Sequence, residues 1–423
     1  MQVALDASSA HILVEKFYSL PGARAQLIQS AWSRAQLEQP VKDEIQEIEI
    51  HQLWTQLLRD HVVPLLRGSD NRLVRVRPSE ATCTSRATLV AAGFPHVLHH
   101  ILRLSNHLLE PYNDTLRSRT MLLLKAAACE ALTHLIRSNP VQRSMFTDAV
   151  TSIVPLIRIT PACAHAAEAL SIMCFECPEN SRRVLAFYKD RLGQALEEVI
   201  EVVKARDAPP RARMWAAVLL RNLAADVFAA ASGLSQMGVA KVYEGARVRS
   251  RLACNDVLQT LVVMALQGPS SAQPPSQMGD DRGWEHDPPG MVAWAAAGAI
   301  ASMAISAGVS VKLVQAGALE ALFALFLSSD PLEACQAGKA LSAIVVDTNS
   351  HAIICEWFRT FHGEFPMSNL RQLNQISQEG RTDMDPLGDS LDSEEQAELA
   401  RAYLELFHRT GKLHIASEGC VII

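Results

Sequence analysis

Five stretches of the chain repeat one pattern of small, apolar and polar positions. Each has small residues, an adjacent apolar pair, a three-residue step to another apolar residue, and then a polar break. They begin at Cys129 (CEALTHLIRSNP), Ala167 (AEALSIMCFECPEN), Ala217 (AVLLRNLAAD), Ala297 (AGAIASMAISAG) and Gly338 (GKALSAIVVDTN). Apolar positions three and four residues apart are typical of a helix that buries one face. The pattern therefore predicts five related helices.

The spacing of these helices indicates stacked repeats. Their equivalent positions are Ala131, Ala169, Leu219, Ala299 and Ala340. The successive steps are 38, 50, 80 and 41 residues, and the shorter steps lie near the period of roughly 40 residues found in helical repeats. The longest step contains 268–290, which is rich in Pro, Gly and Ser. We expect a flexible insertion there; an ordered lid that includes Trp284 is the alternative.

A second pattern precedes two of the predicted helices. TLVAAGFPHVLHHIL from Thr88 and KLVQAGALEALFALF from Lys312 share a short helical segment, a glycine and a longer amphipathic segment. Gly93 and Gly317 stand where the short helix has to end. Glycine favours a left-handed backbone there because it has no Cβ.

The order of short helix, glycine, second helix and Ala/Leu-rich third helix resembles the armadillo repeat family, and HEAT repeats share much of it. The segments LVQAGALEAL and LLRNLAAD carry the resemblance, which spans about residues 85 to 355. It implies a right-handed superhelical solenoid whose concave surface is lined by the third helices. The apolar residues expected to pack between repeats are Leu132, Leu170, Leu220, Ile300 and Leu341.

Composition supports an all-α fold. Hydrophobic residues make up 49% of the chain, aromatic residues only 5%, and no run alternates β-branched and polar residues as a strand does. We expect a helical capping region at 1–84 and armadillo-like repeats at 85–360. An acidic tail with one helix is expected at 361–423.

Charge is distributed unevenly. The formal net charge is −6, and residues from Glu364 onward hold eleven acidic and five basic side chains, so the part before them is neutral. A neutral helical region gives no general affinity for phosphates, and we expect no nucleic-acid partner.

The predicted function is a non-catalytic scaffold or adaptor that binds an extended peptide or a helix of a protein partner. Polar residues on the third helices are the groove candidates: Glu130, His134, Glu168 and Asn222. Solvated helix surface is the alternative for each of them, and a mixed acidic and neutral groove favours a partner with some positive charge. A regulator of a small GTPase, either an exchange factor or a chaperone, is the alternative function, on analogy of fold.

Nuclear-import adaptors of the armadillo family repeat a Trp followed four residues later by an Asn. Here Trp215 is followed by Leu219 and Trp294 by Gly298, and only Asn222 takes the Asn position. Recognition of basic import signals is therefore not expected.

No motif predicts an enzyme, a cofactor or a metal. Cys174 and Cys177 form a lone C-x-x-C without the second pair that a zinc site needs, which favours inert cysteines over zinc or redox chemistry. His96 and His100 share a helix face without an acidic neighbour, which favours groove-lining or exposed histidines over a metal site.

The last four residues read Cys420-Val421-Ile422-Ile423, which resembles the C-a-a-X box of prenyltransferase substrates. We expect a geranylgeranyl group on Cys420 and weak peripheral membrane attachment. A free thiol packed on the last helix is the alternative. Nine scattered cysteines are typical of reduced thiols, so a cytoplasmic protein is expected.

Overall fold

The computed structural model describes the helical parts of the chain. The described residues are 6–19, 44–67, 80–104, 115–137, 140–175, 177–185, 194–232, 248, 250–266, 290–304, 308–326, 331–346, 348–350 and 353–354. All secondary structure within these ranges is helical. The described residues divide into two compact units, with unit 1 ending at Glu198 and unit 2 beginning at Val199. The boundary falls inside helix α12 and within the range 85–360 expected to hold the repeats.

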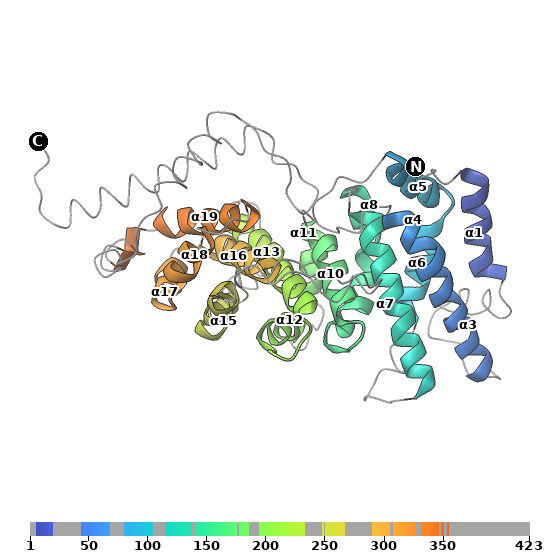
Figure 1. Ribbon diagram of the computed structural model, residues 1–423, viewed down its shortest axis with the longest axis horizontal. Helices are drawn as coiled ribbons and strands as arrows, with labels where there is room; N and C mark the ends of the chain where they lie inside the picture. Colours follow the sequence, from blue (N-terminus) through green and yellow to red (C-terminus); the bar gives the residue numbers. More distant parts are fainter. Residues whose placement is uncertain are drawn as a thin grey trace, which may run out of the picture. The chain divides into compact units, whose positions relative to one another are not determined.

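Unit 1 is built from helices and short helical turns. In chain order they are α1 (Ala7–Ser19), α3 (Glu44–Gln56), the π-helix η1 (Leu57–Val62), α4 (Val63–Arg67), α5 (Glu80–Ala91), α6 (Phe94–Arg103), α7 (Leu116–Ile136), α8 (Pro140–Met145), η3 (Thr147–Ala149), α9 (Val150–Ile153), η4 (Val154–Arg158), α10 (Cys163–Cys174), α11 (Pro178–Leu185) and the start of α12 (Gln194–Lys204). Helix α7 packs against α3 on one side and α10 on the other (Figure 1).

The elements α3, η1 and α4 follow one another without a break and form a single helix of 44–67. Pro64 has no N–H, so the usual hydrogen bond to the residue four positions earlier is missing there. The preceding turn widens, and the N–H of Val63 donates to the carbonyl of Leu58 five residues back. This helix takes the place of a third helix beside α7, inside the region 1–84 that was expected to be a cap.

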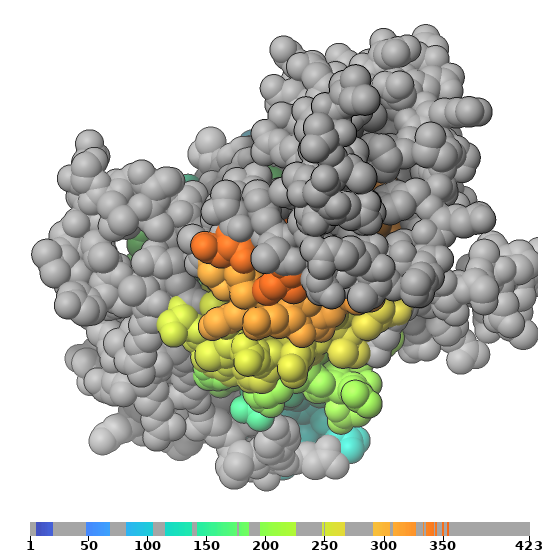
Figure 2. Space-filling model, turned by 90° about the vertical axis from the view of Figure 1, so that its left-hand side faces the viewer, coloured from blue at the N-terminus to red at the C-terminus, as the bar shows by residue number. Residues whose placement is uncertain are grey.

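Unit 2 holds the rest of α12 and the helices that follow. They are α13 (Pro210–Ser232), α15 (Asn255–Leu266), α16 (Gly290–Ala304), α17 (Val309–Gln315), α18 (Ala318–Phe326), α19 (Pro331–Val346) and the 3-10 turn η6 (Thr348–Ser350). Helix α16 packs between α13 and α19 (Figure 1). In Figure 2 the yellow atoms of α15 lie beside the orange atoms of α16 to α18, as their contacts require.

The predicted repeat is confirmed in both units. Gly93 separates α5 from α6 with φ 87°, and Gly317 separates α17 from α18 with φ 87°. Each short helix thus ends at a left-handed glycine, as its sequence predicts. A second helix and then a third helix, α7 or α19, follow in each case.

The predicted core is confirmed as well. Ala131, Ala169, Leu219, Ala299 and Ala340 are fully buried. Leu132, Leu170, Leu220 and Ile300 are also fully buried, and Leu341 is 2% exposed. The pattern of apolar positions therefore located the inward faces of α7, α10, α13, α16 and α19.

Some expectations fall outside the described residues. They concern the insertion at 268–290, except Gly290 at the start of α16, and the tail at 361–423 with Cys420. Among the described helices no single one is long and apolar enough to cross a membrane. The pair α17 and α18 together meets the length and composition of a span but is bent by 83°.

Candidate functional site

The groove candidates Glu130 and Glu168 lie on the third helices α7 and α10 and form ion pairs between neighbouring helices. Arg67 Nη2, at the end of α4, donates to Glu130 Oε1 at 2.7 Å. Arg137 Nη2, directly after α7, donates to Glu168 Oε1 at 2.9 Å. Glu168 is 1% exposed, so its carboxylate offers little surface to a partner. The two acids therefore bind arginines from the preceding third helix.

The other two candidates are also largely covered. His134 is 3% exposed in the last turn of α7, and Asn222 is 6% exposed in α13. The Asn222 Oδ1 accepts a hydrogen bond from Arg221 Nε at 3.2 Å. Glu130 and His134 lie one turn apart on α7, while Asn222 belongs to unit 2.

In unit 2 the same kind of contact between third helices has a different chemistry. The Arg221 guanidinium of α13 lies over the ring of Trp294 of α16, with Cζ 5.6 Å from the ring centroid. One turn after Trp294 is Gly298, where a Cβ would stand 2.9 Å from Arg221 Cδ and 3.4 Å from Gln336 Oε1 of α19. Gly298 is therefore the point where side chains from both neighbouring third helices meet the backbone of α16.

Trp294 carries a buried donor without an acceptor. The side chain is 2% exposed, and among the residues that the structure describes no acceptor lies within hydrogen-bond reach of Nε1. Trp54 in unit 1 is equally buried, but its Nε1 donates to the Phe17 carbonyl at 3.1 Å. An unmade hydrogen bond of a buried donor costs free energy. The Trp294 indole is therefore a place where an acceptor from outside the described residues would be stabilising.

The described side chains of the unit 2 third helices are predominantly basic. On α13, α16 and α19 these are Arg211, Arg213, Arg221 and Lys339, against the one described acid Glu333. Glu333 is 3% exposed, whereas Arg221 and Lys339 are partly exposed. We call the side of these helices around Arg221, Gly298 and Lys339 the unit 2 third-helix face; Arg221 and Lys339 are partly exposed there, and Gly298 is buried.

A short sequence signal precedes each of the arginines that reach the next third helix. The chain reads LLR at Arg67, LIR at Arg137 and LLR at Arg221. The positions contacted are Glu130, Glu168 and Gly298, which are equivalent in the repeat. The apolar and polar pattern singled out the acids and the glycine but not the arginines.

A buried lysine supports α6 in unit 1. Lys125 of α7 is fully buried, and its Nζ donates to the carbonyls of Leu102 at 3.3 Å and Leu104 at 2.6 Å. These carbonyls lie at the C-terminal end of α6, where helices have unpaired acceptors. Burial lowers the pKa of Lys125 to about 7, while Cys129 acts weakly in the opposite direction. Nothing in the sequence pattern distinguishes this lysine from a solvated one.

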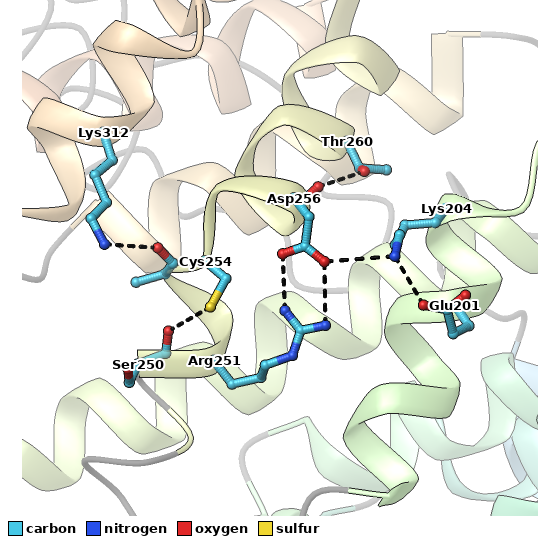
Figure 3. A network of polar contacts seen from close by, with 9 residues as sticks. Glu201, Lys204, Ser250, Arg251, Cys254, Asp256, Thr260 and Lys312 are labelled. Carbon is cyan, nitrogen blue, oxygen red and sulfur yellow. Dashed lines mark hydrogen bonds and ion pairs between the residues drawn. The ribbon is translucent and has the colours of Figure 1, made fainter.

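A surface network joins three helices of unit 2 (Figure 3). Arg251 binds both carboxylate oxygens of Asp256 in the first turn of α15, at 3.0 and 3.4 Å. Lys204 of α12 lies 3.6 Å from Asp256 Oδ2 and 3.0 Å from Glu201. Lys312 of α17 donates to the Ala253 carbonyl at 3.1 Å. The network ties α12 and α17 to the start of α15, and its exposed pairs add little stability each.

The cysteine and histidine pairs do not assemble a metal site within the described ranges. No group of three or more His, Cys, Asp or Glu side chains there is arranged to hold a metal. Cys174 is fully buried and Cys177 9% exposed, and both are free thiols. His96 is exposed and His100 half-buried on α6, where burial lowers the pKa of His100, and His96 and Arg103 lower it further.

No family model and no curated protein matches the chain. Solved structures that resemble it include an engineered protein with 17% identity and a TM-score of 0.46, over 74% of this chain and 97% of that chain. A second is a designed armadillo repeat protein in complex with the peptide (KR)4, with 16% identity and a TM-score of 0.42, over 73% of this chain and 99% of that chain. A third belongs to computationally designed armadillo repeat proteins for modular peptide recognition, with 16% identity and a TM-score of 0.43, over 73% of this chain and 99% of that chain.

The helix order of the chain itself identifies its repeat. A short helix, a left-handed glycine, a second helix and a long third helix occur as α5, Gly93, α6 and α7 and again as α17, Gly317, α18 and α19. Successive third helices then pack side by side in each unit. The chain therefore has an armadillo-like repeat fold.

Proposed function

We propose that the protein is a non-catalytic interaction scaffold that binds an extended peptide or a helix of a protein partner on the unit 2 third-helix face. The observation that carries the proposal is the pair of partly exposed basic side chains, Arg221 on α13 and Lys339 on α19, whose helices pack on either side of α16. Repeat proteins of this type use the surface formed by successive repeats for binding.

A peptide offers backbone groups that can pair with polar side chains of this face. Each residue of a bound chain brings a backbone carbonyl that can accept from an N–H, and an extended chain presents such carbonyls at regular intervals. Arg221 contributes further donors, and Gln336 of α19 contributes both a donor and an acceptor. Arg221 and Lys339 thus stand on the two helices that pack on either side of α16, and an extended segment that crosses α16 could contact both.

The test uses the full chain and an array of immobilised random peptides of about 15 residues, a length that spans several repeats. Trp294→Phe puts a smaller ring under the guanidinium of Arg221 and so changes how that side chain is held, and we expect weaker capture of the peptides that the wild-type chain binds. Trp54→Phe in unit 1 is the matched control and should leave capture unchanged. Equal capture by the wild-type chain and Trp294→Phe would contradict binding at this face.

Two finer expectations stay predictions. Geranylgeranylation of Cys420, with weak membrane attachment of an otherwise cytoplasmic protein, concerns a residue outside the described ranges. Intact mass and membrane fractionation of Cys420→Ser against wild type in a eukaryotic cell test it. Regulation of a small GTPase is favoured by no contact among the described residues, and a nucleotide-release assay against a GTPase panel tests it.

A further inference from the structure

We propose that the interface between α3 and α7 in unit 1 is a pH-sensitive contact, which is closed while His51 is neutral and opens when His51 binds a proton. Peptide binding on the unit 2 third-helix face does not depend on this contact, since His51 belongs to unit 1. Three features of the interface support such a switch: the burial of His51, the lack of hydrogen-bond partners around its ring, and the charges that face it.

His51 is a buried base without a hydrogen-bond partner. The side chain lies on α3 and is 1% exposed. Among the residues that the structure describes, neither Nδ1 nor Nε2 has a partner within reach, and the ring centroid lies 6.0 Å from that of Trp54. A neutral imidazole leaves one donor and one acceptor unpaired here, whereas an imidazolium would bury two donors and a net charge. Protonation is therefore the costly state.

The charges that act on His51 oppose its protonation. Arg117 and Lys125 of α7 both raise the energy of an imidazolium at this place. Lys125 is itself fully buried, with Nζ on the carbonyls of Leu102 and Leu104. Burial, together with these two cations, lowers the pKa of His51 to about 4. The folded interface therefore excludes the proton that a solvated histidine takes up below about pH 6.5.

No carboxylate within the described ranges compensates these cations at His51. The one acid of α7, Glu130, binds Arg67 at the other end of the interface. The charged and titratable residues of η1 are exposed, namely Arg59, Asp60 and His61. Those of α1 are exposed as well, including His11, Glu15 and Lys16. An imidazolium at position 51 thus has no ion-pair partner in the closed interface.

A local separation of α3 from α7 is enough to relieve this cost. Within the described chain, the extensive contacts of α3 are with α7 and with η1, which continues it. Towards α1, Trp54 Nε1 donates to the Phe17 carbonyl at 3.1 Å. Stacked repeats contact only their neighbours, so one interface can open while others stay closed. Opening admits water to His51 and gives an imidazolium its hydrogen bonds, so acid favours the open form.

The size of the effect follows from the shift of the histidine. Its pKa of about 4 in the closed form lies below the ordinary value of 6.5, so the open form binds more protons in the range between them. The equilibrium constant for opening should therefore rise about 30-fold from about pH 7.5 to about pH 5. Lys125 adds a smaller rise over this range, because most of its penalty is already present at the upper end.

The first experiment measures hydrogen exchange of the full chain at about pH 7.5 and about pH 5, corrected for the intrinsic exchange rates. On acidification, amides of α3 and the facing α7 should lose about 30-fold more protection in wild type than in His51→Phe, since Phe fills the site and binds no proton. Amides of α13 and α16 should change equally in both proteins. Equal pH dependence of α3 in the two proteins would overturn the proposal, and so would a His51-dependent loss that is as large in unit 2.

Two further variants separate titration from packing. His51→Leu replaces the ring by a smaller apolar side chain and should lose the same acid-dependent component as His51→Phe, whatever its stability at neutral pH. His61→Phe is the matched control, because His61 is exposed on η1 in the same continuous helix, and it should keep the wild-type pH dependence. If His61→Phe removes that dependence, the effect does not arise at the α3–α7 interface and the proposal is wrong.

A direct titration tests the histidine itself. In the full chain with isotope-labelled histidine, the nuclear magnetic resonance signal of His51 is the one that is missing from His51→Phe. It should remain that of a neutral imidazole at about pH 5.5, where solvated histidines are mostly charged. A His51 signal that titrates near pH 6.5 would show that the closed interface accepts the proton and would sink the proposal.

Discussion

The two units connect their third helices in two different ways. In unit 1 an arginine at the end of one third helix binds a glutamate on the next, and both partners are mostly buried. In unit 2 an arginine crosses to the next third helix at the same repeat position but meets a glycine and the face of a tryptophan. The repeat position that holds a glutamate in α7 and α10 is thus a glycine in α16.

This difference shows that neighbouring third helices of one fold can be joined by two kinds of contact. A buried ion pair is largely satisfied within the molecule, and removing one partner leaves a costly charge behind. A cation on an aromatic face contributes about 0.5–2 kcal/mol and does not depend on a buried charge of opposite sign. The same backbone arrangement therefore carries an ion pair in unit 1 and a contact between a guanidinium and an aromatic ring in unit 2.

The largest expected effect comes from breaking the contact between α7 and α10. Glu168→Leu should lower the free energy of unfolding by about 3–5 kcal/mol, because Arg137 loses the carboxylate that compensates its buried charge. Chemical denaturation followed by circular dichroism measures it. Glu130→Leu, at a more exposed pair, should cost less.

A double variant sharpens that result. Arg137→Met combined with Glu168→Leu removes both charges and should recover most of the stability lost in Glu168→Leu, since a pair of apolar side chains needs no compensation. If the double variant is as unstable as Glu168→Leu, the loss comes from packing and the ion pair is not the reason.

The next effect is a pH dependence that belongs to unit 1. The pKa of Lys125 is lowered from 10.5 to about 7 in the folded chain, so the unfolded chain binds the extra proton between these values. Stability should therefore rise with pH across this window by about 2–4 kcal/mol, and the penalty is fully present below pH 7. Lys125→Met should abolish this rise.

The measurement is the free energy of unfolding at several pH values between about 6.5 and 10, with the difference between the wild-type chain and Lys125→Met as the readout. Local hydrogen exchange of α6 and α7 should show the same trend, whereas α13 and α16 should not. A pH profile that is identical in the two proteins would mean that Lys125 keeps an ordinary pKa.

A smaller effect compares the two buried tryptophans. Trp54→Phe leaves the Phe17 carbonyl without its donor and should cost about 1–2 kcal/mol more than Trp294→Phe, whose indole N–H has no acceptor among the described residues. The change in ring size is the same in both, so the difference in melting temperature isolates the hydrogen bond. Equal losses would mean that the Trp294 N–H is satisfied in solution.

The smallest effect concerns Gly298. Gly298→Ala improves helix propensity by about 0.5–1 kcal/mol but pushes the Arg221 side chain, which a Cβ would approach to 2.9 Å, away from the helix. We expect the two to offset within about 0.5 kcal/mol, with a weaker contact of Arg221 on Trp294. Thermal melting and the intrinsic fluorescence of the chain follow the two effects separately.

Much of the fold could be predicted because repeats are local in sequence. The alternation of small and apolar positions located the buried sides of the third helices, and Gly93 and Gly317 marked the turns between helices. The helix 44–67 was missed as a third helix. Pro64 and the wide turn before it interrupt the regular spacing on which the other predictions depend.

The contacts of the candidate residues could not be predicted in the same way. Arg67 and Glu130 are 63 positions apart, and Arg137 and Glu168 are 31 apart. A polar residue on a helix surface has the same local pattern whether it faces solvent or a neighbouring repeat. The repeated LLR and LIR segments were the one signal that connected these arginines, and only the packing of the third helices gives that signal a meaning.

The wide turn in the first third helix sets the rotational phase of the arginine that follows it. Each π-helical residue rotates the chain about the helix axis by less than an α-helical residue does. Six of them therefore leave the rest of the helix rotated back by about 100° relative to an uninterrupted α-helix. Arg67 follows within α4 and faces Glu130 at that angle. A substitution of Pro64 that restored the regular hydrogen bond would swing Arg67 around the helix axis and away from α7. The orientation of one charged contact is thus encoded by an uncharged residue three positions before it.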